Sequence, residues 1–359
     1  MIAFGDIYRD RRVLLTGHTG FKGSWLSLWL KTLGAKTTGL ALSPNSISSH
    51  WDLLNLDMDD NRIDIRSADE VVNVVQTVDP EIVFHLAAQP LVRRSYHDPL
   101  ETWSTNVMGT ANVLEACRHK TSVRAIVVIT TDKCYENYEW ERGYHENDRL
   151  GGYDPYSASK ASAELVVSSY RNAFFNQHSE TLIATARAGN VIGGGDWSAD
   201  RLIPDLVRTI DKNKAVEIRS PNATRPWQHV LESLAGYLCL GQKLIEGKQE
   251  FAQAWNFGPD DDGNRTVKSV LSLIKEEWPS IDWRVIDRPQ PYEAKLLHLD
   301  STKARQQLAW QPVWSFDKGL RATLEWYRMN IEHGSVISLN QLNAYTAAAR
   351  QAGLEWSDK

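Results

Sequence analysis

The chain of 359 residues predicts an α/β fold, a doubly wound parallel sheet followed by a smaller mixed α/β lobe. Its first half alternates short β-branched runs, such as residues 126–129, with amphipathic helical patterns, which is typical of a parallel sheet covered by helices on both faces. After Arg187 the composition changes, and a glycine-rich loop at residues 189–197 begins a different arrangement. We therefore expect a Rossmann-type domain over residues 1–187 and a ligand-binding lobe over residues 188–359. The segment near 226–258 is a candidate to return to the first domain.

A glycine-rich turn follows the first predicted strand, residues 12–15, and precedes a helical pattern at residues 24–33. Gly17 allows the tight turn, Gly20 lets the backbone approach a pyrophosphate, and Gly23 lets the helix pack on the strand. The start of the helix offers free N–H groups to the phosphates. This strand, turn and helix predict a dinucleotide site whose first cofactor-binding residues are Gly17, His18, Thr19, Gly20, Phe21 and Lys22.

The end of the second strand, residues 37–42, should carry an acid that binds the adenosine ribose of NAD, but Ser43 stands there. This position therefore does not choose between NAD and NADP, and Lys22 could favour a phosphate. Asp64, at the end of a short third strand and next to Ile65, is a candidate adenine contact. Its alternative role is an N-cap for the helix predicted over residues 68–78.

A fourth strand, residues 82–86, ends in small residues against which a cofactor can lie, and a helix is expected over residues 106–119. This part of the chain adds the cofactor-binding candidates Leu86, Ala87, Ala88, Gln89 and Asn106.

The fifth predicted strand, residues 126–129, ends in the polar run Thr130, Thr131, Asp132 and Lys133. A long helical pattern then runs from Asp154 to Phe175. Tyr156 and Lys160 share one face of that helix, and an ammonium near a phenol favours the phenolate. Tyr156 could then act as a base near neutral pH. Taken alone, Tyr156 and Lys160 could also be two exposed residues on the surface of a helix. Their position after a strand that ends in this polar run favours a catalytic site.

The rest of the chain continues as short strands and helices. Strands are expected at residues 182–187, 216–218, 255–257 and 283–286, and helices at residues 201–211, 230–245, 267–278, 316–327 and 339–353.

The composition favours a small-molecule ligand. The formal net charge is −5 and the pI is about 6.1, without a basic stripe, which disfavours nucleic acid and membrane surfaces as partners. Three cysteines without Cys-x-x-Cys spacing indicate neither a metal site nor a disulfide framework. The N-terminus lacks the apolar core of a signal peptide. We expect a cytoplasmic protein that forms a homo-oligomer, either a dimer or a tetramer.

Several motifs in order resemble the extended short-chain dehydrogenase/reductase family, and within it most closely the CDP-glucose 4,6-dehydratases. The resemblance covers residues 12–320. It rests on residues 16–23 (TGHTGFKG), 85–94 (HLAAQPLVRR), 105–110 (TNVMGT), 130–135 (TTDKCY), 187–197 (RAGNVIGGGDW) and 225–230 (RPWQHV), together with Tyr156 and Lys160.

The resemblance implies an NAD-dependent lyase that oxidises a nucleotide-bound hexose at C4, eliminates water across C5 and C6, and returns the hydride to C6. Tyr156 would deprotonate the C4 hydroxyl, and Thr131 would hydrogen-bond the same hydroxyl. Lys160 would lower the pKa of Tyr156 and hold the nicotinamide ribose, so that Thr130, Tyr156 and Lys160 also count among the cofactor-binding residues. Asp132 would protonate the departing C6 hydroxyl. Lys133 replaces the glutamate of related dTDP- and GDP-sugar enzymes. It would either take the C5 proton or stabilise the enolate charge, and these alternatives stay open.

By the same resemblance, Asn190, Arg201, Arg225 and Arg288 would meet the nucleotide diphosphate, which suits an arginine fork. A surface ion pair is the alternative for each arginine. A nucleotide-sugar 4-epimerase is the alternative activity, since it shares the oxidation at C4 but needs no acid for C6.

Overall fold

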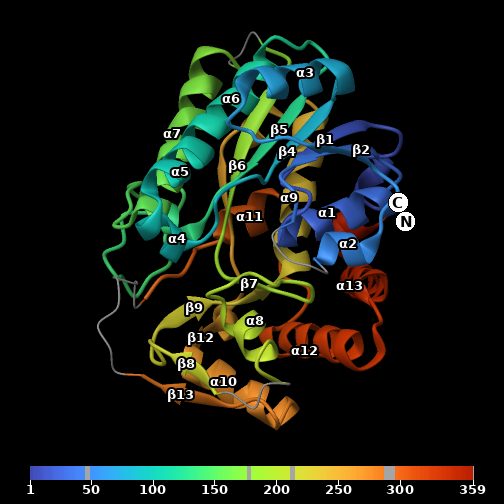
Figure 1. Ribbon diagram of the computed structural model, residues 1–359. Helices are drawn as coiled ribbons and strands as arrows, with labels where there is room; N and C mark the ends of the chain where they lie inside the picture. Colours follow the sequence, from blue (N-terminus) through green and yellow to red (C-terminus); the bar gives the residue numbers. More distant parts are fainter. Residues whose placement is uncertain (45–48, 176–178, 211–214, 287–295, 359) are drawn as a thin grey trace.

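The computed structural model describes residues 1–44, 49–175, 179–210, 215–286 and 296–358. A seven-stranded sheet occupies one half of the molecule, with the strand order β11-β6-β5-β4-β1-β2-β3 and every neighbouring pair parallel (Figure 1). The predicted doubly wound α/β fold is therefore confirmed. The strands are β1 (Arg12–Thr16), β2 (Lys36–Ala41), β3 (Asp59–Arg62), β4 (Ile82–His85), β5 (Ala125–Ile129), β6 (Leu182–Ala188) and β11 (Ala254–Phe257).

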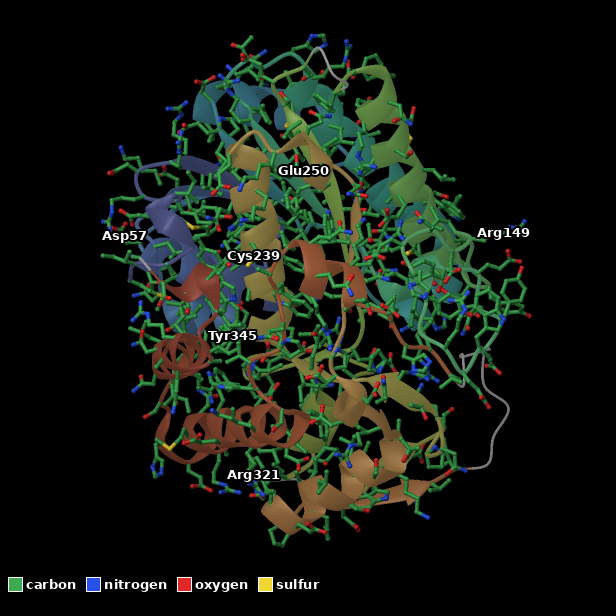
Figure 2. The ribbon with its side chains drawn as sticks, turned by 180° about the vertical axis from the view of Figure 1, so that it is seen from behind. Asp57, Arg149, Cys239, Glu250, Arg321 and Tyr345 are labelled. Carbon is green, nitrogen blue, oxygen red and sulfur yellow. The ribbon has the colours of Figure 1, made fainter. Side chains whose placement is uncertain are left out.

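Each face of the sheet is covered by its own helices, because successive side chains of a strand point to opposite faces. On one face, Leu14 and Ile126 pack against α3 (Ala68–Val78), α6 (Gly109–Arg118) and α7 (Pro155–Ala173). On the other face, Leu15 and Val127 pack against α1 (Phe21–Thr32) and α9 (Val230–Ile245). Figure 2, seen from behind, shows α9 lying along this second face, with Cys239 on it. The central strands are thus buried on both sides.

The second lobe lies beyond the carboxyl ends of the strands (Figure 1). It contains three two-stranded pairings: β7 (Val191–Ile192) with β10 (Gln228–His229), β8 (Val216–Ile218) with β13 (Trp283–Val285), and β9 (Thr224–Pro226) with β12 (Asn264–Thr266). Its helices are α8 (Leu202–Val207), α10 (Val267–Glu277), α12 (Phe316–His333) and α13 (Ser338–Gln351).

The chain crosses between the two lobes more than once. After residues 191–229 have formed part of the second lobe, α9 returns to the sheet, and β11 pairs with β6 at its edge. The short helix α11 (Thr302–Gln307) then covers this edge, where the Lys303 ammonium donates to the carbonyl of Ala254 at 2.7 Å. Segments from both ends of the sequence therefore build the first lobe.

A buried carboxylate ties α9 to the C-terminal helices. Glu232 accepts hydrogen bonds from the backbone N–H groups of Val313 and Trp314 at 2.9 and 2.8 Å, and from the Tyr345 hydroxyl at 2.7 Å. A carboxylate can accept about four hydrogen bonds. The three that Glu232 accepts therefore offset much of the free energy that its burial costs.

Several helix boundaries differ from those predicted. The helix expected over residues 106–119 begins with a π-helical segment, Ser104–Met108, and α8 spans Leu202–Val207 rather than residues 201–211. Helix α12 runs on to His333, where Gly334 at φ 63° ends it. The short helices α2 (His50–Leu54), α4 (Val92–His97) and α5 (Pro99–Trp103) were not predicted, because five or six residues show no reliable periodicity. In the part of the chain that the structure describes, no helix has the length and apolar character to cross a bilayer.

Candidate active site

A cleft of about 1500 Å³ lies where the carboxyl ends of the strands face the second lobe. A typical pocket for one drug-sized ligand measures roughly 300–1000 Å³, so this cleft has room for a dinucleotide and a second large ligand together. From the first lobe it is lined by the glycine turn, residues 86–89, residues 129–133, Tyr156 and Lys160, and from the second lobe by Asn190, Arg201 and Arg225. The structure therefore gathers most of the predicted site residues around one space.

The glycine turn has the shape that a diphosphate requires. Gly17 has φ +78°, and a Cβ there would lie 2.6 Å from the backbone nitrogen of Ala87. A Cβ on Gly20 would meet only the carbonyl of Gly17, at 3.3 Å, so its other side is open to the cleft. Because α1 begins immediately afterwards at Phe21, its first N–H groups are available to an anion. These residues fit a dinucleotide cofactor.

The side chains of two residues of the turn are bonded to other parts of the protein. The His18 imidazole is buried and contacts Asp60 at 2.8 Å, so only the backbone of His18 is placed toward a cofactor. The Lys22 ammonium donates to the Tyr237 hydroxyl of α9 at 3.1 Å. Burial, then the neighbouring charge of Arg201, lowers the pKa of Lys22 to about 7. Lys22 therefore does not stand at the end of β2, where a 2′-phosphate would lie.

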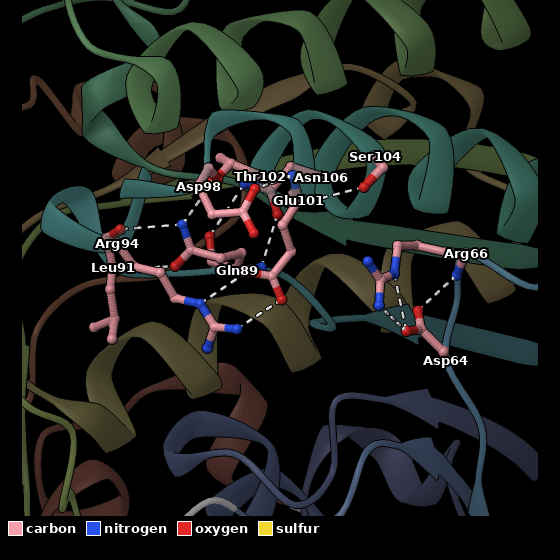
Figure 3. Close-up of polar contacts among 10 residues, drawn as sticks. All are labelled: Asp64, Arg66, Gln89, Leu91, Arg94, Asp98, Glu101, Thr102, Ser104 and Asn106. Carbon is pink, nitrogen blue, oxygen red and sulfur yellow. Dashed lines mark hydrogen bonds and ion pairs between the residues drawn. The ribbon is translucent and has the colours of Figure 1, made fainter. Parts of the chain in front are cut away.

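Asp64 lines one end of the cleft, and it forms the ion pair with Arg66 that Figure 3 shows. Its carboxylate accepts from Nε and Nη2 of Arg66 at 2.9 and 2.6 Å, and from the Arg66 backbone N–H at 2.9 Å. This contact lowers the pKa of Asp64. The alternative role as a helix N-cap is wrong, because Ser67 holds the N-cap position of α3. Ile65 and Ser43 also line this end.

Asn106 supports the cleft from behind. Its side-chain oxygen accepts from the backbone N–H of Gln89 at 2.8 Å, and its amide donates to the Gln89 carbonyl (Figure 3). The same amide also donates to the Ser159 hydroxyl at 2.8 Å. The Gln89 side chain in turn donates to Thr102 at 2.9 Å. Asn106 is buried and therefore fixes the end of β4 against α7, while Leu86, Ala87 and Ala88 form the surface of the cleft.

The polar run after β5 forms a compact cluster with Tyr156. The Thr131 hydroxyl donates to Asp132 at 2.9 Å, and its proximity to the Tyr156 phenol lowers the pKa of that phenol. Asp132 is 1% exposed, and its Oδ2 has no hydrogen-bond partner among the residues described. The Lys133 ammonium lies 4.0 Å from Asp132 Oδ1. A proton acceptor, a buried carboxyl and a lysine therefore share one end of the cleft.

Tyr156 and Lys160 lie in the first turns of α7, which Asp154 caps by accepting from the backbone of Ser157 at 3.0 Å. The Lys160 ammonium donates to the carbonyl of Ile129 at 3.2 Å. Burial lowers the pKa of Lys160 to about 8 and raises that of Tyr156 to about 12, against the opposing influence of the Thr131 hydroxyl. This upward shift is opposite to the one expected from Lys160, because burial of the phenol outweighs the neighbouring charges.

Of the four residues predicted to meet a diphosphate, three line the second-lobe side of the cleft. Arg201 forms an ion pair with Asp196 at 3.0 Å, which raises the pKa of Arg201. Arg225 on β9 is buried and donates to the carbonyl of Thr224 at 2.9 Å. Asn190 lies two residues after the end of β6. Arg288 lies outside the described residues.

Sequence reasoning missed two residues directly behind the site, Glu164 and Arg187. They form an ion pair of 2.8 Å, and both side chains are almost fully buried. Two features of the sequence could have identified them. Glu164 is an acid four residues after Lys160, on the same face of the helix, and Arg187 stands in a strand otherwise made of apolar and small residues.

This fold and this site define a dinucleotide-dependent enzyme of the extended short-chain dehydrogenase/reductase class, with an acid and a lysine added to its tyrosine and lysine pair. A family model described as GDP-mannose 4,6 dehydratase matches residues 14–323. The chain belongs to this family.

Individual relatives agree with this assignment. The CDP-glucose 4,6-dehydratase of Salmonella typhimurium is 46% identical, covering 96% of this chain and 98% of the relative. The dTDP-D-glucose 4,6-dehydratase of Homo sapiens is 26% identical, covering 90% and 91%. Among solved structures, an epimerase from Methanothermobacter thermautotrophicus matches with a TM-score of 0.81 and 25% identity over 91% of this chain and 95% of that chain. The dTDP-glucose 4,6-dehydratase of Streptomyces venezuelae has a TM-score of 0.75 at 21% identity, covering 89% and 98%, and shows the shared fold.

Proposed function

We propose that this protein is a CDP-glucose 4,6-dehydratase, a hydro-lyase that converts CDP-D-glucose to CDP-4-keto-6-deoxy-D-glucose and water. The observation that carries the proposal is the cluster of Thr131, Asp132, Lys133 and Tyr156 at one end of the cleft. Its members supply a proton acceptor for the C4 hydroxyl and a separate acid and base for C6 and C5. The 46% identity to a CDP-glucose 4,6-dehydratase over nearly the whole chain supports CDP-glucose as the substrate.

The cofactor is NAD, which fits the glycine turn, the small residues after β4, and Tyr156 and Lys160. When bound, it supplies the acceptor for the C4 hydride and the donor for C6. Ser43 cannot accept bonds from two ribose hydroxyls as a carboxylate does, so we expect NAD to be held less tightly than in relatives with an acid at this position.

The residues of the cluster divide the proton transfers among them. Tyr156, once ionised to the phenolate, accepts the proton of the C4 hydroxyl, and Thr131 orients that hydroxyl. Asp132 gives a proton to the C6 hydroxyl, which leaves as water, and its buried Oδ2 has no competing partner among the described residues. Lys133, when neutral, takes the C5 proton; as a cation, it stabilises the enolate. A proton returned to C5 and the hydride returned to C6 complete the product.

Asn190, Arg201 and Arg225 bind the diphosphate of the substrate from the second lobe, where they line the cleft opposite the glycine turn. This assignment corresponds to a division of the chain into a cofactor domain, residues 1–187, and a substrate lobe, residues 188–359. The pairing of β11 with β6 supports placing most of residues 226–258 with the cofactor domain.

The path of the hydrogens tests the reaction. Substrate deuterated at C4, mixed with unlabelled substrate of a different mass, should give deuterium at C6 without crossover between molecules, because one pocket carries out both the oxidation and the reduction. A reaction in D₂O should place solvent deuterium at C5, since a side chain removes that hydrogen as a proton. Mass spectrometry of the product measures both positions.

Two other results would contradict the proposal. Substantial crossover of deuterium between molecules would mean that an intermediate escapes from the cleft. A 4-epimerised hexose that retains all its oxygens would establish the epimerase activity instead.

We propose that the protein forms a homo-oligomer through an apolar patch on α5, the π-helical segment and α7. Leu100, Trp103, Met108 and Leu165 are exposed there by 79, 37, 57 and 60%, and these elements lie side by side.

Sedimentation of the wild-type protein should show a dimer or a tetramer, and Leu165→Glu should shift it toward the monomer. A matched change at the exposed Leu339 of α13 should leave the assembly intact; a monomeric wild-type protein would refute the patch as an interface.

A cytoplasmic location is consistent with the three cysteines. Cys117, Cys134 and Cys239 are all buried free thiols, the form that a reducing compartment maintains.

A further inference from the structure

A buried ion pair lies behind the catalytic cluster and joins α7 to β6. Glu164 accepts two hydrogen bonds from Arg187, at 2.9 Å from Nε and 2.8 Å from Nη2, in a bidentate arrangement. The two side chains are 3 and 4% exposed. A buried ion pair of this kind does not by itself stabilise a fold, because the cost of desolvating both charges can cancel their attraction. We therefore looked for a role of this pair in the active site.

The pair is bonded directly to the end of the catalytic strand. The Thr130 hydroxyl donates to Glu164 at 2.5 Å, and the Thr185 hydroxyl of β6 donates to its other oxygen at 2.7 Å. One residue before Thr130, the carbonyl of Ile129 accepts from the Lys160 ammonium. Two successive residues at the end of β5 are therefore fixed to α7, one through Lys160 and one through Glu164.

Lys160 and Glu164 also act on each other as charges. They are four residues apart, so they stand on the same face of α7. Burial lowers the pKa of Lys160, and Glu164 and the Cys134 thiol raise it. The charge of Lys160 in turn lowers the pKa values of Lys22 and His85. The pKa of Cys134 itself is raised by burial, and burial lowers the pKa of His85 to about 3, so both are neutral at physiological pH. Glu164 is thus the acid that counters both the burial of Lys160 and the nearby ammonium of Lys22.

Arg187 keeps that acid ionised. Its guanidinium lowers the pKa of Glu164 against burial. The same guanidinium donates through Nη1 to the Tyr135 hydroxyl at 2.8 Å and to the Glu146 carbonyl at 3.0 Å, so it also fixes the segment that follows Lys133.

We propose that Glu164, held by Arg187, is a positioning residue for the reaction: it fixes Thr130, the residue before Thr131, against α7 and serves as the permanent counter-charge of Lys160. The catalytic lysine then remains an ammonium in a buried site. The effect on turnover rests on the proposed function, whereas the effect on the charge of Lys160 does not.

The test measures the titration of Lys160 directly. Cofactor-free protein is acetylated with a trace of acetic anhydride at a series of pH values, and the labelled peptides are quantified by mass spectrometry. In Glu164→Gln we expect the midpoint for Lys160 to fall by about one pH unit, because a neighbouring opposite charge is removed. The alkaline limb of the kcat profile with CDP-glucose should move to lower pH by a similar amount.

A second variant separates charge from folding. Glu164→Gln leaves Arg187 buried without its partner, which could unfold the protein, whereas Glu164→Met with Arg187→Met removes both charges at similar volume and should fold. Glu232→Gln is the matched control, because it makes the same substitution at another buried carboxylate, one whose partners are Val313 and Tyr345 near the C-terminus. It should leave the Lys160 midpoint unchanged. A folded double variant with an unchanged Lys160 midpoint would overturn the proposal. If instead wild-type protein does not dehydrate CDP-glucose but Lys160 shifts as expected, the proposed substrate fails and this inference stands.

Discussion

Replacing Tyr156 by phenylalanine should lower kcat by about 10³-fold, within the range that general acid–base catalysis contributes. The phenol is the group that meets the C4 hydroxyl, and phenylalanine keeps the buried ring, so the change removes the proton acceptor and leaves the packing of α7 in place. Turnover is measured as loss of water from CDP-glucose by mass spectrometry, and substrate affinity by calorimetry, where we expect little change.

The adjacent Tyr153 offers a matched control for this change. It is 77% exposed and also lines the cleft, so Tyr153→Phe makes the same chemical alteration three residues away. It should retain turnover. A Tyr156→Phe variant with near wild-type rates would refute the mechanism.

Lys133→Met should separate the two halves of the reaction. Oxidation at C4 depends on Tyr156 and Lys160, whereas elimination also needs Lys133, so the variant should oxidise its substrate once and release little product. Rapid mixing should show one equivalent of reduced cofactor by its absorbance, followed by a steady rate lower by about 10²–10⁴-fold, the contribution of one acid–base group.

The exposed Lys36 provides the control, since Lys36→Met removes the same charge far from the cleft and should leave both phases unchanged. If Lys133→Met dehydrates normally, the lysine is structural and the base lies elsewhere. Glu136 is then the first candidate, because it also lines the cleft, although it now pairs with Arg149 at 2.9 Å.

The layout of the fold could be predicted closely from the sequence because its signals are local. A strand buried on both faces, such as β5, is a continuous apolar run, and the glycine turn has a steric requirement that few other residues meet. Helix α9 has the predicted bounds, residues 230–245, because its apolar pattern is long. Short helices such as α4 depend on tertiary contacts and have no comparable signal.

The electrostatics of the site could not be predicted, because they depend on distances between segments far apart in the chain. The sequence places Lys22 in the glycine turn, yet its ammonium reaches Tyr237, which is 215 residues later. The direction of the Tyr156 pKa shift depends on how deeply the phenol is buried, which spacing within one helix cannot show. The partnership of Glu164 with Arg187 joins a helix to the neighbouring strand and is visible only in three dimensions.

The position of β11 in the sheet bears on how the protein folds as it is synthesised. This strand completes the edge beside β6, yet four of the second lobe's six described strands, β7 to β10, lie between the two in the chain. The ribosome must therefore produce residues up to Phe257 before the seven-stranded sheet is complete. The segment between β6 and β11 must then form a large loop. Until then the edge of β6 is free to pair with another chain, so nascent chains stalled before β11 should depend most on chaperones.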